Sequence, residues 1–181
     1  MPNTLILVAG PSGAGKDSII NACRPLLTSD ARIHFARRVV TRDAQSPGEQ
    51  LVSVPTFEKL KAEGGLAFDW AAHGLMYGLP REELLPDGTV QVIIANVSRT
   101  VIPAISVQYP SHVVFINASD SHIRARLRLR DREMSNDIEE RLSRKVLLPK
   151  DVPMTTIQND GTLAEAATQF RKTILRFTTK V

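Results

Sequence analysis

The residues most suited to chemistry form a glycine-rich run that ends in a lysine near the N-terminus. The run from Gly10 to Lys16 fits the spacing G-x-x-x-x-G-K of a phosphate-binding loop. Its glycines let backbone N–H groups converge on phosphate oxygens, and a helix that begins after the loop points its positive dipole end at the anion. Lys16 can reach the β- and γ-phosphates. We predict that ATP binds at Gly10, Pro11, Ser12, Gly13, Ala14, Gly15, Lys16, Asp17 and Ser18.

The residue after the lysine departs from the usual pattern. A Ser or Thr normally follows, and its hydroxyl contacts Mg²⁺, whereas here Asp17 precedes Ser18. A carboxylate is a hard oxygen ligand suited to Mg²⁺, so Asp17 is a candidate metal ligand, directly or through water. An acid that is simply favoured by the helix dipole is an equal alternative. The apolar strand expected at 90–95 is followed by Asn96 rather than by a metal-holding acid, which argues against a motor or switch GTPase.

A second group of candidates is suited to hold a phosphorylated acceptor. Arg38 and Arg42 lie at the end of the strand expected at 35–41, and Tyr77 follows later. Guanidinium groups match phosphate geometry, and a phenol adds one hydrogen bond. The alternatives are strand-edge charge for Arg38 and core packing for Tyr77. His73 could contact a sugar or a phosphate, and a structural histidine beside Gly74 is an equal interpretation.

An arginine-rich stretch is the candidate source of positive charge over a moving phosphoryl group. It contains Arg124, Arg126, Arg128, Arg130 and Arg132, with Arg141 and Arg144 beyond. On a helix, Arg126 and Arg130 share one face. A solvated surface and a basic RNA-binding face are the alternatives. The second is poorly supported because no aromatic residues lie between the arginines to stack on bases.

Composition and patterning predict the elements that must position these residues. With 181 residues, 43% hydrophobic and 23% charged, the chain fits one α/β domain spanning residues 1–181. Apolar β-branched runs alternate with helical patterns, which is typical of a mainly parallel sheet between helical layers, the three-layer P-loop NTPase architecture. Strands are expected at 4–9, 35–41, 66–72, 75–78, 90–95, 112–116 and 154–157. Helices are expected at 15–24, from Ser53 to Gly64, at 81–85, 99–107, 120–130 and 137–148, and from Asp160 or Thr162 to Phe177.

Other features bound the class of protein. No stretch approaches the roughly 20 apolar residues of a membrane span, and no basic region precedes the first apolar run. Cys23 is the single cysteine, so a cytoplasmic protein without internal disulfides or a zinc cluster is expected. The net charge of +4 favours an anionic partner but does not identify it. The oligomeric state stays open.

The order and spacing of several motifs resemble guanylate kinase over nearly the whole chain. They are the loop, Thr41-Arg42 with Gly48-Glu49, Trp70-x-x-His73-Gly74 and Tyr77-Gly78. Four details are more similar to a sister family, the ribose 1,5-bisphosphate phosphokinases of bacterial phosphonate catabolism. These are Gly15–Ser18, Trp70–Gly78, Asn96–Arg99 and Arg132-Glu133. The resemblance implies an ATP-dependent phosphotransferase that uses Mg²⁺ and converts α-D-ribose 1,5-bisphosphate to 5-phosphoribosyl 1-diphosphate.

Departures from guanylate kinase favour the sugar phosphate over GMP. The second arginine of the guanylate kinase motif has no counterpart between Asp43 and Pro47, and no tyrosine occurs at 50–54. Asn96 replaces an acid of the central strand, and Asp69 stands where a guanine-reading Glu would be. Each loss removes a contact to guanine or to the GMP phosphate, and lost polar complementarity lowers specificity strongly. Guanylate kinase, a non-catalytic guanylate-kinase-like binding module and an RNA-binding or regulatory NTPase remain the alternatives.

The resemblance also implies a division of labour along the chain. It implies a core of about 1–34, 88–122 and 150–181, an acceptor-binding region of about 35–87 and a helical lid of about 123–149. Lys16, Arg130 and Arg141 are the expected catalytic residues. Asn159 is expected to contact adenine, with a turn asparagine as the equal alternative. The expected substrate-binding residues are Arg38, Arg42, Asp69, His73, Tyr77, Asn96 and Arg99.

Overall fold

A five-stranded parallel sheet forms the centre of the computed structural model, with the strand order β2-β7-β1-β8-β9. The structure describes residues 3–42, 47–85, 88–130, 149 and 151–178. The strands of this sheet are β1 (Thr4–Ala9), β2 (Ile33–Phe35), β7 (Val92–Asn96), β8 (Ser111–Asn117) and β9 (Met154–Gln158). The α/β class and the parallel central sheet predicted from the sequence are therefore confirmed.

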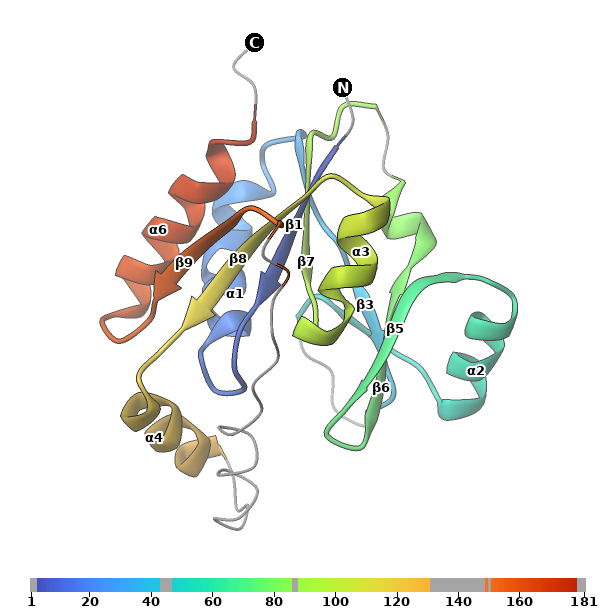
Figure 1. The fold of residues 1–181 in the computed structure, drawn as a ribbon, viewed down its shortest axis with the longest axis horizontal. Coiled ribbons are helices and arrows are strands. Elements are labelled where there is room, and N and C mark those ends of the chain that lie inside the picture. Colours follow the sequence, from blue (N-terminus) through green and yellow to red (C-terminus); the bar gives the residue numbers. More distant parts are fainter. Residues whose placement is uncertain (1–2, 43–46, 86–87, 131–148, 150, 179–181) are drawn as a thin grey trace.

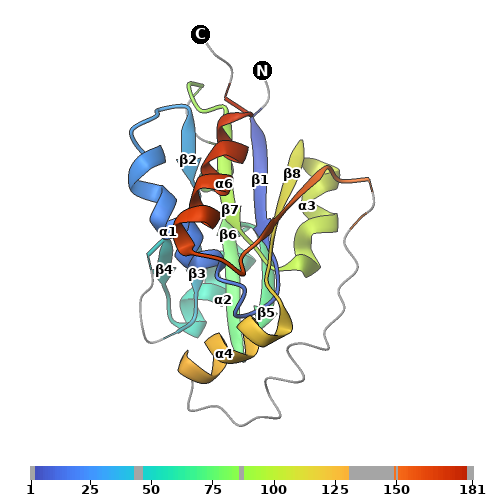
Figure 2. The ribbon, with the colours of Figure 1, turned by 90° about the vertical axis from the view of Figure 1, so that its left-hand side faces the viewer.

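Helices cover both faces of this sheet, as Figures 1 and 2 show. Successive side chains of a strand point to opposite faces. On β1, Ile6 and Val8 pack with α1 (Lys16–Leu27) and α6 (Leu163–Leu175), whereas Leu5 and Leu7 pack with α3 (Ile102–Gln108). Because both faces are buried, the strand is apolar throughout rather than alternating.

The turn between β1 and α1 has a backbone that requires glycine. Gly10 has φ +149°, and a Cβ there would collide with the carbonyl oxygen of Ile116 on β8. Gly15 caps α1 in the left-handed conformation, with φ 93°. The helix then continues through Pro25 to Leu27, three residues beyond the end predicted at Arg24.

A second, four-stranded sheet with the order β4-β3-β6-β5 carries the acceptor-side candidates. Its strands are β3 (Arg38–Val40), β4 (Glu49–Leu51), β5 (Leu66–Ala72) and β6 (Leu75–Pro80), and α2 (Val54–Ala62) packs on it through Phe57. β3 runs parallel to β4 and antiparallel to β6. Figure 1 shows this sheet beside the central one, below α3.

The prediction of one strand at 35–41 is wrong. The last bond to the central sheet runs from Ala36 N–H to the Ile94 carbonyl at 2.9 Å, and the chain then crosses to the second sheet, where Arg38 pairs with Glu49. Strand-favouring residues lie on both sides of the crossing, Phe35 before it and Val39 and Val40 after it, so the local pattern does not reveal it. The short strand β4 was not predicted.

The remaining elements agree with the predicted ones within a few residues. They are η1 (Arg81–Leu84), η2 (Arg99–Val101), α3, α4 (Asp120–Arg130) and α6. Thr162, not Asp160, caps α6: its side chain accepts from the Glu165 N–H, and the Glu165 carboxylate accepts from the Thr162 N–H. The helix predicted at 137–148 lies outside the described residues. No helix in the described part of the chain combines the length and apolar character needed to cross a membrane.

Candidate functional site

The glycine-rich loop lies at the carboxyl end of β1 and is braced from behind. Asn159 follows β9, is 4% exposed, and its side-chain N–H donates to the Ala14 carbonyl at 2.8 Å. Arg126 of α4 donates to the Asn159 carbonyl at 2.8 Å and to the Ala14 carbonyl at 3.4 Å. These bonds hold the loop against the sheet.

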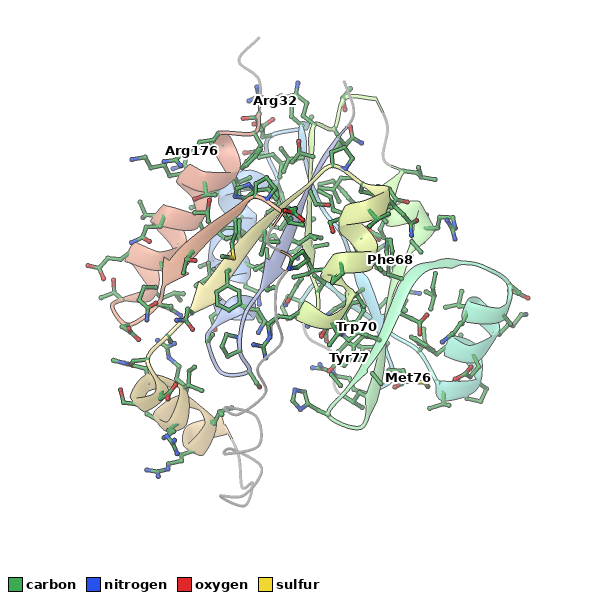
Figure 3. All side chains as sticks on the ribbon, in the orientation of Figure 1. Arg32, Phe68, Trp70, Met76, Tyr77 and Arg176 are labelled. Atoms are coloured by element: carbon green, nitrogen blue, oxygen red, sulfur yellow. The ribbon has the colours of Figure 1, made fainter. Side chains whose placement is uncertain are left out.

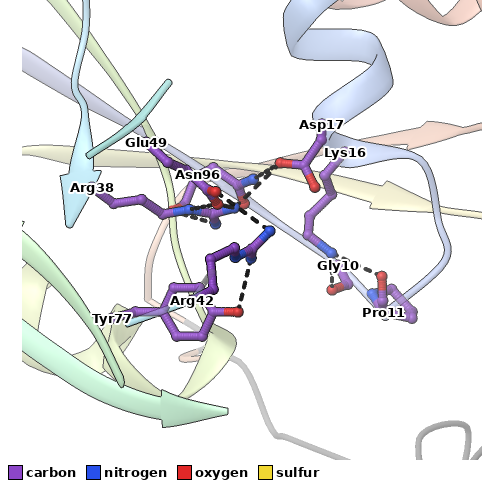
Figure 4. Close-up of polar contacts among 9 residues, drawn as sticks. All are labelled: Gly10, Pro11, Lys16, Asp17, Arg38, Arg42, Glu49, Tyr77 and Asn96. Carbon is purple, nitrogen blue, oxygen red and sulfur yellow. Dashed lines mark hydrogen bonds and ion pairs between the residues drawn. The ribbon is translucent and has the colours of Figure 1, made fainter. Parts of the chain in front are cut away.

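Lys16 is folded back on the loop. Its Nζ donates to the carbonyls of Gly10 at 2.9 Å and Pro11 at 2.8 Å (Figure 4). The ammonium therefore lies against the first two residues of the loop. A phosphate bound there would replace these carbonyl bonds with stronger charge-assisted ones.

Asp17 links the loop to the neighbouring strand. Its Oδ1 accepts from the Asn96 side-chain N–H at 2.6 Å and lies 3.4 Å from Nη2 of Arg38. Asn96 ends β7, which pairs with β1 in a register that sets Asn96 opposite Val8. Strand pairing therefore brings a residue 79 positions away to the side of the loop.

A buried carboxylate organises the arginines of the second sheet. Glu49 has a side chain that is 2% exposed, and its Oε1 accepts from Nε of Arg38 at 2.9 Å and from Nη2 at 2.6 Å. Its Oε2 lies 3.4 Å from Nη1 of Arg42. A paired buried carboxylate of this kind holds both guanidinium groups in fixed orientations.

Aromatic rings support the same arginines. Arg42 donates to the Tyr77 hydroxyl at 3.1 Å, and the Arg38 guanidinium lies 5.4 Å from the centre of the Tyr77 ring. Tyr77 in turn stacks on Trp70 with ring centres 5.7 Å apart and nearly parallel planes (Figure 3). Both rings are less than a tenth exposed, so they fix the floor of the site.

One cleft joins these parts. Gly10, Ser12, Lys16 and Asp17 of the loop line it on one side, and Arg38, Arg42, Trp70 and Tyr77 line it on the other. His73, Asn96 and Arg99 complete the wall. His73 is an exposed residue of the tight turn between β5 and β6, where it has φ 53°. The structure thus gathers six of the seven expected substrate-binding residues around one opening.

Asp69 is the exception and is not brought into the cleft. It alternates with Trp70 on β5, so its side chain points to the other face of the strand, where it accepts from Nζ of Lys61 on α2 at 2.7 Å. That hydrogen bond raises the pKa of Lys61. The expected substrate contact of Asp69 is therefore corrected to a surface ion pair with Lys61. The physical reason is that neighbouring side chains of a strand point to opposite faces, and Trp70 is the one that faces the cleft.

The described residues place the other candidates less directly. Asn159 is buried behind the loop, so the contact that the structure shows for it is to the carbonyl of the buried loop residue Ala14 rather than at an exposed base-binding surface. Arg130 is the last residue of α4. Arg132, Arg141 and Arg144 lie outside the described residues.

Two buried acids were missed by the sequence reasoning. Glu49 belongs to a Gly-Glu motif that was noticed but given no role. Glu83 of η1 is 6% exposed and joins the two sheets: it lies 2.7 Å from Nε2 of His34 on β2 and accepts from the Arg37 N–H at 3.0 Å. Burial opposes its ionisation, but the hydrogen bonds from His34 and Arg37 outweigh that effect, and the pKa of Glu83 is lowered. Glu83 directly follows Arg81 and Glu82, so the sequence around it gives no local signal of burial.

The donor set at the loop fits a magnesium nucleotide. Asn96 Oδ1 is buried and accepts no hydrogen bond from the described residues, and the Asp17 side chain is half exposed beside it. Carboxylate and amide oxygens suit Mg²⁺, which usually keeps several waters and takes only one or two protein carboxylates beside substrate phosphates. The described residues form no group of three or more His, Cys, Asp or Glu side chains that could hold a metal ion.

Loop, parallel sheet and arginine-lined cleft together define a phosphotransferase of the P-loop class. The fold is that of guanylate kinase: the enzyme from Anaplasma phagocytophilum superposes with a TM-score of 0.68 over 99% of this chain and 88% of its own, at 16% sequence identity. None of the protein-family models compared matches the chain.

Sequence comparison narrows the class to one family. The ribose 1,5-bisphosphate phosphokinase PhnN of Rhodopseudomonas palustris is 44% identical over 164 residues, which cover 88% of this chain and 82% of that protein. The protein of the same name from Pseudofrankia inefficax is 40% identical over 177 residues, covering 96% of this chain and 92% of its own. The chain belongs to the ribose 1,5-bisphosphate phosphokinase family.

Proposed function

We propose that this protein transfers the γ-phosphoryl group of ATP to the 1-phosphate of α-D-ribose 1,5-bisphosphate. An oxygen of the 1-phosphate forms a bond to the γ-phosphorus while the bond to the β–γ bridging oxygen breaks, which gives ADP and 5-phosphoribosyl 1-diphosphate. Family membership supports this reaction, since the curated relatives carry that name. 5-Phosphoribosyl 1-diphosphate would then be formed as a step of phosphonate catabolism, the pathway to which the resembled family belongs.

The observation that carries the proposal is the single cleft lined on one side by the loop and on the other by Arg38 and Arg42. A phosphoryl group held by Lys16 and a phosphorylated acceptor held by the arginines would meet in that opening. Phosphoryl transfer depends mainly on positioning and charge neutralisation, because the acceptor phosphate and the γ-phosphoryl group need little covalent help from the protein once they are aligned.

The acceptor needs no general base. A phosphate oxygen is already anionic near neutral pH, so no side chain has to remove a proton before attack. Arg38 and Arg42, which Glu49 holds in place, would bind the acceptor's phosphates through their guanidinium groups. His73, Tyr77, Asn96 and Arg99 would contact the sugar and its phosphates from the cleft wall.

The donor would be held by the loop. Backbone N–H groups from Gly10 to Ser18 would surround the β-phosphate, and Lys16 would turn from the Gly10 and Pro11 carbonyls to the β- and γ-oxygens. Asp17 would hold Mg²⁺, whose charge neutralises the phosphates when it is bound. Arg130 and Arg141 would add positive charge over the transferring group.

Two contacts support a sugar acceptor over GMP. Asp69 is paired with Lys61 on the face of β5 away from the cleft, and Asn96 donates to Asp17. These are the positions at which the guanylate kinase resemblance puts groups that read guanine. A base-reading site needs buried polar groups directed at the base. Here the Asp69 carboxylate is held by Lys61 and the Asn96 side-chain N–H is held by Asp17.

A coupled assay of ADP release tests the proposal. The protein is supplied with Mg·ATP and either ribose 1,5-bisphosphate or GMP at equal concentration, and the sugar product is identified by its consumption in a phosphoribosyltransferase reaction. We expect turnover with the sugar bisphosphate at least about a hundredfold faster than with GMP. Faster turnover of GMP would overturn the proposal, as would the absence of turnover with either acceptor.

A further inference from the structure

Two positions that usually hold Mg²⁺ in P-loop proteins have exchanged their chemical types in this chain. The usual arrangement is a hydroxyl after the loop lysine and an acid at the end of a neighbouring strand. Here the acid, Asp17, follows Lys16, and the neutral residue, Asn96, ends β7. Each departure by itself removes a standard metal contact, but together they keep one carboxylate beside the phosphates.

The structure joins these two residues directly. The Asn96 side-chain N–H donates to Asp17 Oδ1 at 2.6 Å, although the residues are 79 positions apart. Figure 4 shows the contact between the strand end and the first turn of α1. The pairing of β7 with β1 fixes the position of Asn96, and the start of α1 fixes that of Asp17.

The free oxygens of the pair are the ones suited to a cation. Among the described residues, Asp17 Oδ1 takes the contacts from Asn96 and Arg38, which leaves Oδ2 without a hydrogen bond. Asn96 Oδ1 is buried and likewise accepts none from the described residues. A buried amide oxygen without a partner is unfavourable unless a ligand or water satisfies it.

We propose that the metal-holding carboxylate has been transposed from the end of β7 to the loop, so that Asp17 and Asn96 act as one unit. Asp17 supplies the charge for Mg²⁺, and Asn96 orients that carboxylate through its N–H and directs its own oxygen to the metal or a metal-bound water. The inference rests on the proposed binding of a magnesium nucleotide and does not depend on which acceptor is used.

A simpler arrangement would use Asp17 only as a partner for Arg38. Their separation of 3.4 Å is longer than the 2.6 Å between Arg38 and Glu49, so Glu49 holds Arg38 more closely. A role confined to Arg38 would also leave the Asn96 oxygen unexplained. The two arrangements differ in one measurable respect, the affinity of the nucleotide complex for a divalent cation.

The test measures Mn²⁺ affinity of the full chain with ADP bound, from the electron paramagnetic resonance signal of free Mn²⁺, and ADP affinity without metal in EDTA. The variants are Asp17→Asn, Asp17→Ser and the double variant Asp17→Ser with Asn96→Asp, which restores the usual arrangement. Asp30→Asn is the matched control, because Asp30 is paired with Arg32 beyond the opposite end of α1. Thermal unfolding checks that each variant is folded.

We expect Asp17→Asn and Asp17→Ser to weaken Mn²⁺ binding about tenfold or more, with ADP affinity in EDTA unchanged within about threefold. The double variant should recover Mn²⁺ affinity to within about threefold of the parent, and Asp30→Asn should match the parent. Two outcomes would overturn the transposition and leave the proposed nucleotide site standing. One is that Asp17→Asn binds ADP and keeps the Mn²⁺ affinity of the parent. The other is that the double variant binds Mn²⁺ no more tightly than Asp17→Ser. Failure of the parent to bind ADP would overturn the proposed nucleotide site and this inference with it.

Discussion

The two sides of the cleft are built in different ways. The proposed donor side is one continuous segment from Gly10 to Ser18, in which backbone groups and one lysine would provide the binding chemistry. The acceptor side is assembled from side chains of β3, β4 and β6 and the loop that holds Arg42, and its arginines depend on the buried Glu49. A backbone site is specified locally, whereas a side-chain site exists only once the strands have paired.

The largest expected effect is on the donor side. Lys16→Ala removes the only charged group of the loop that can follow the γ-phosphate, and we expect kcat to fall about 10²- to 10³-fold, the size found for removing one stabilising donor. Lys172→Ala, an exposed lysine of α6, is the control. Turnover of Lys16→Ala at the parent's rate would contradict the donor assignment.

On the acceptor side, Glu49→Gln should be the most damaging single change. The amide cannot neutralise Arg38 and Arg42, so both guanidinium groups lose their fixed orientation. We expect the KM for the acceptor to rise about tenfold or more while the KM for ATP stays near that of the parent. Glu63→Gln on α2 is the control, because that carboxylate is exposed and its ion pair with Lys59 is long, at 3.8 Å. If the KM for ATP rose as much as the KM for the acceptor, Glu49 would not act on the acceptor side of the cleft alone.

Asn159→Ala tests the brace behind the loop. It removes the donor to the Ala14 carbonyl and leaves a buried acceptor without it, which should lower the free energy of unfolding by about 1–3 kcal/mol. The KM for ATP should rise, and the KM for the acceptor should change less. Asn117→Ala on the adjacent strand removes only an exposed bond to Gln158 and serves as the control. Unchanged stability and unchanged ATP binding would show that the loop keeps its shape unaided.

Glu83 connects the two sides, and its effect should depend on pH. Because its folded-state pKa lies below the ordinary value of 4.5, its ionised form stabilises the fold above that pH, and this contribution is lost as pH falls through the lowered pKa. The free energy of unfolding, measured from pH 6 down to pH 3, should therefore fall less for Glu83→Gln than for the parent. Parallel curves would mean that Glu83 does not couple the sheets through its charge.

The smallest effect should come from Asp69→Asn. The Lys61–Asp69 pair is largely exposed and faces away from the cleft, so stability should change by less than about 1 kcal/mol. The KM for the acceptor should stay within about twofold of the parent. A rise of tenfold would bring Asp69 back into the acceptor site and weaken the argument against a base.

The accuracy of the sequence predictions follows the same division. The strand at 4–9 and the strand at 66–72 were predicted with the observed bounds, because an apolar run between turn residues is a local signal. The strand at 35–41 was wrong, since its break at Ala36 depends on which sheet each half joins. Asp69 was assigned to the cleft from motif position, but strand alternation turned its side chain away.

The sequence by itself determined the parallel sheet and predicted the phosphate loop and the acceptor arginines, because these follow from residue types at short spacings. Only the tertiary structure decided that Glu49 holds Arg38 and Arg42, that Asn159 braces the loop, and that Asn96 meets Asp17. Those contacts join residues far apart in the chain. They are set by strand order and register, which arise from burying many side chains at once and leave no local mark in the sequence.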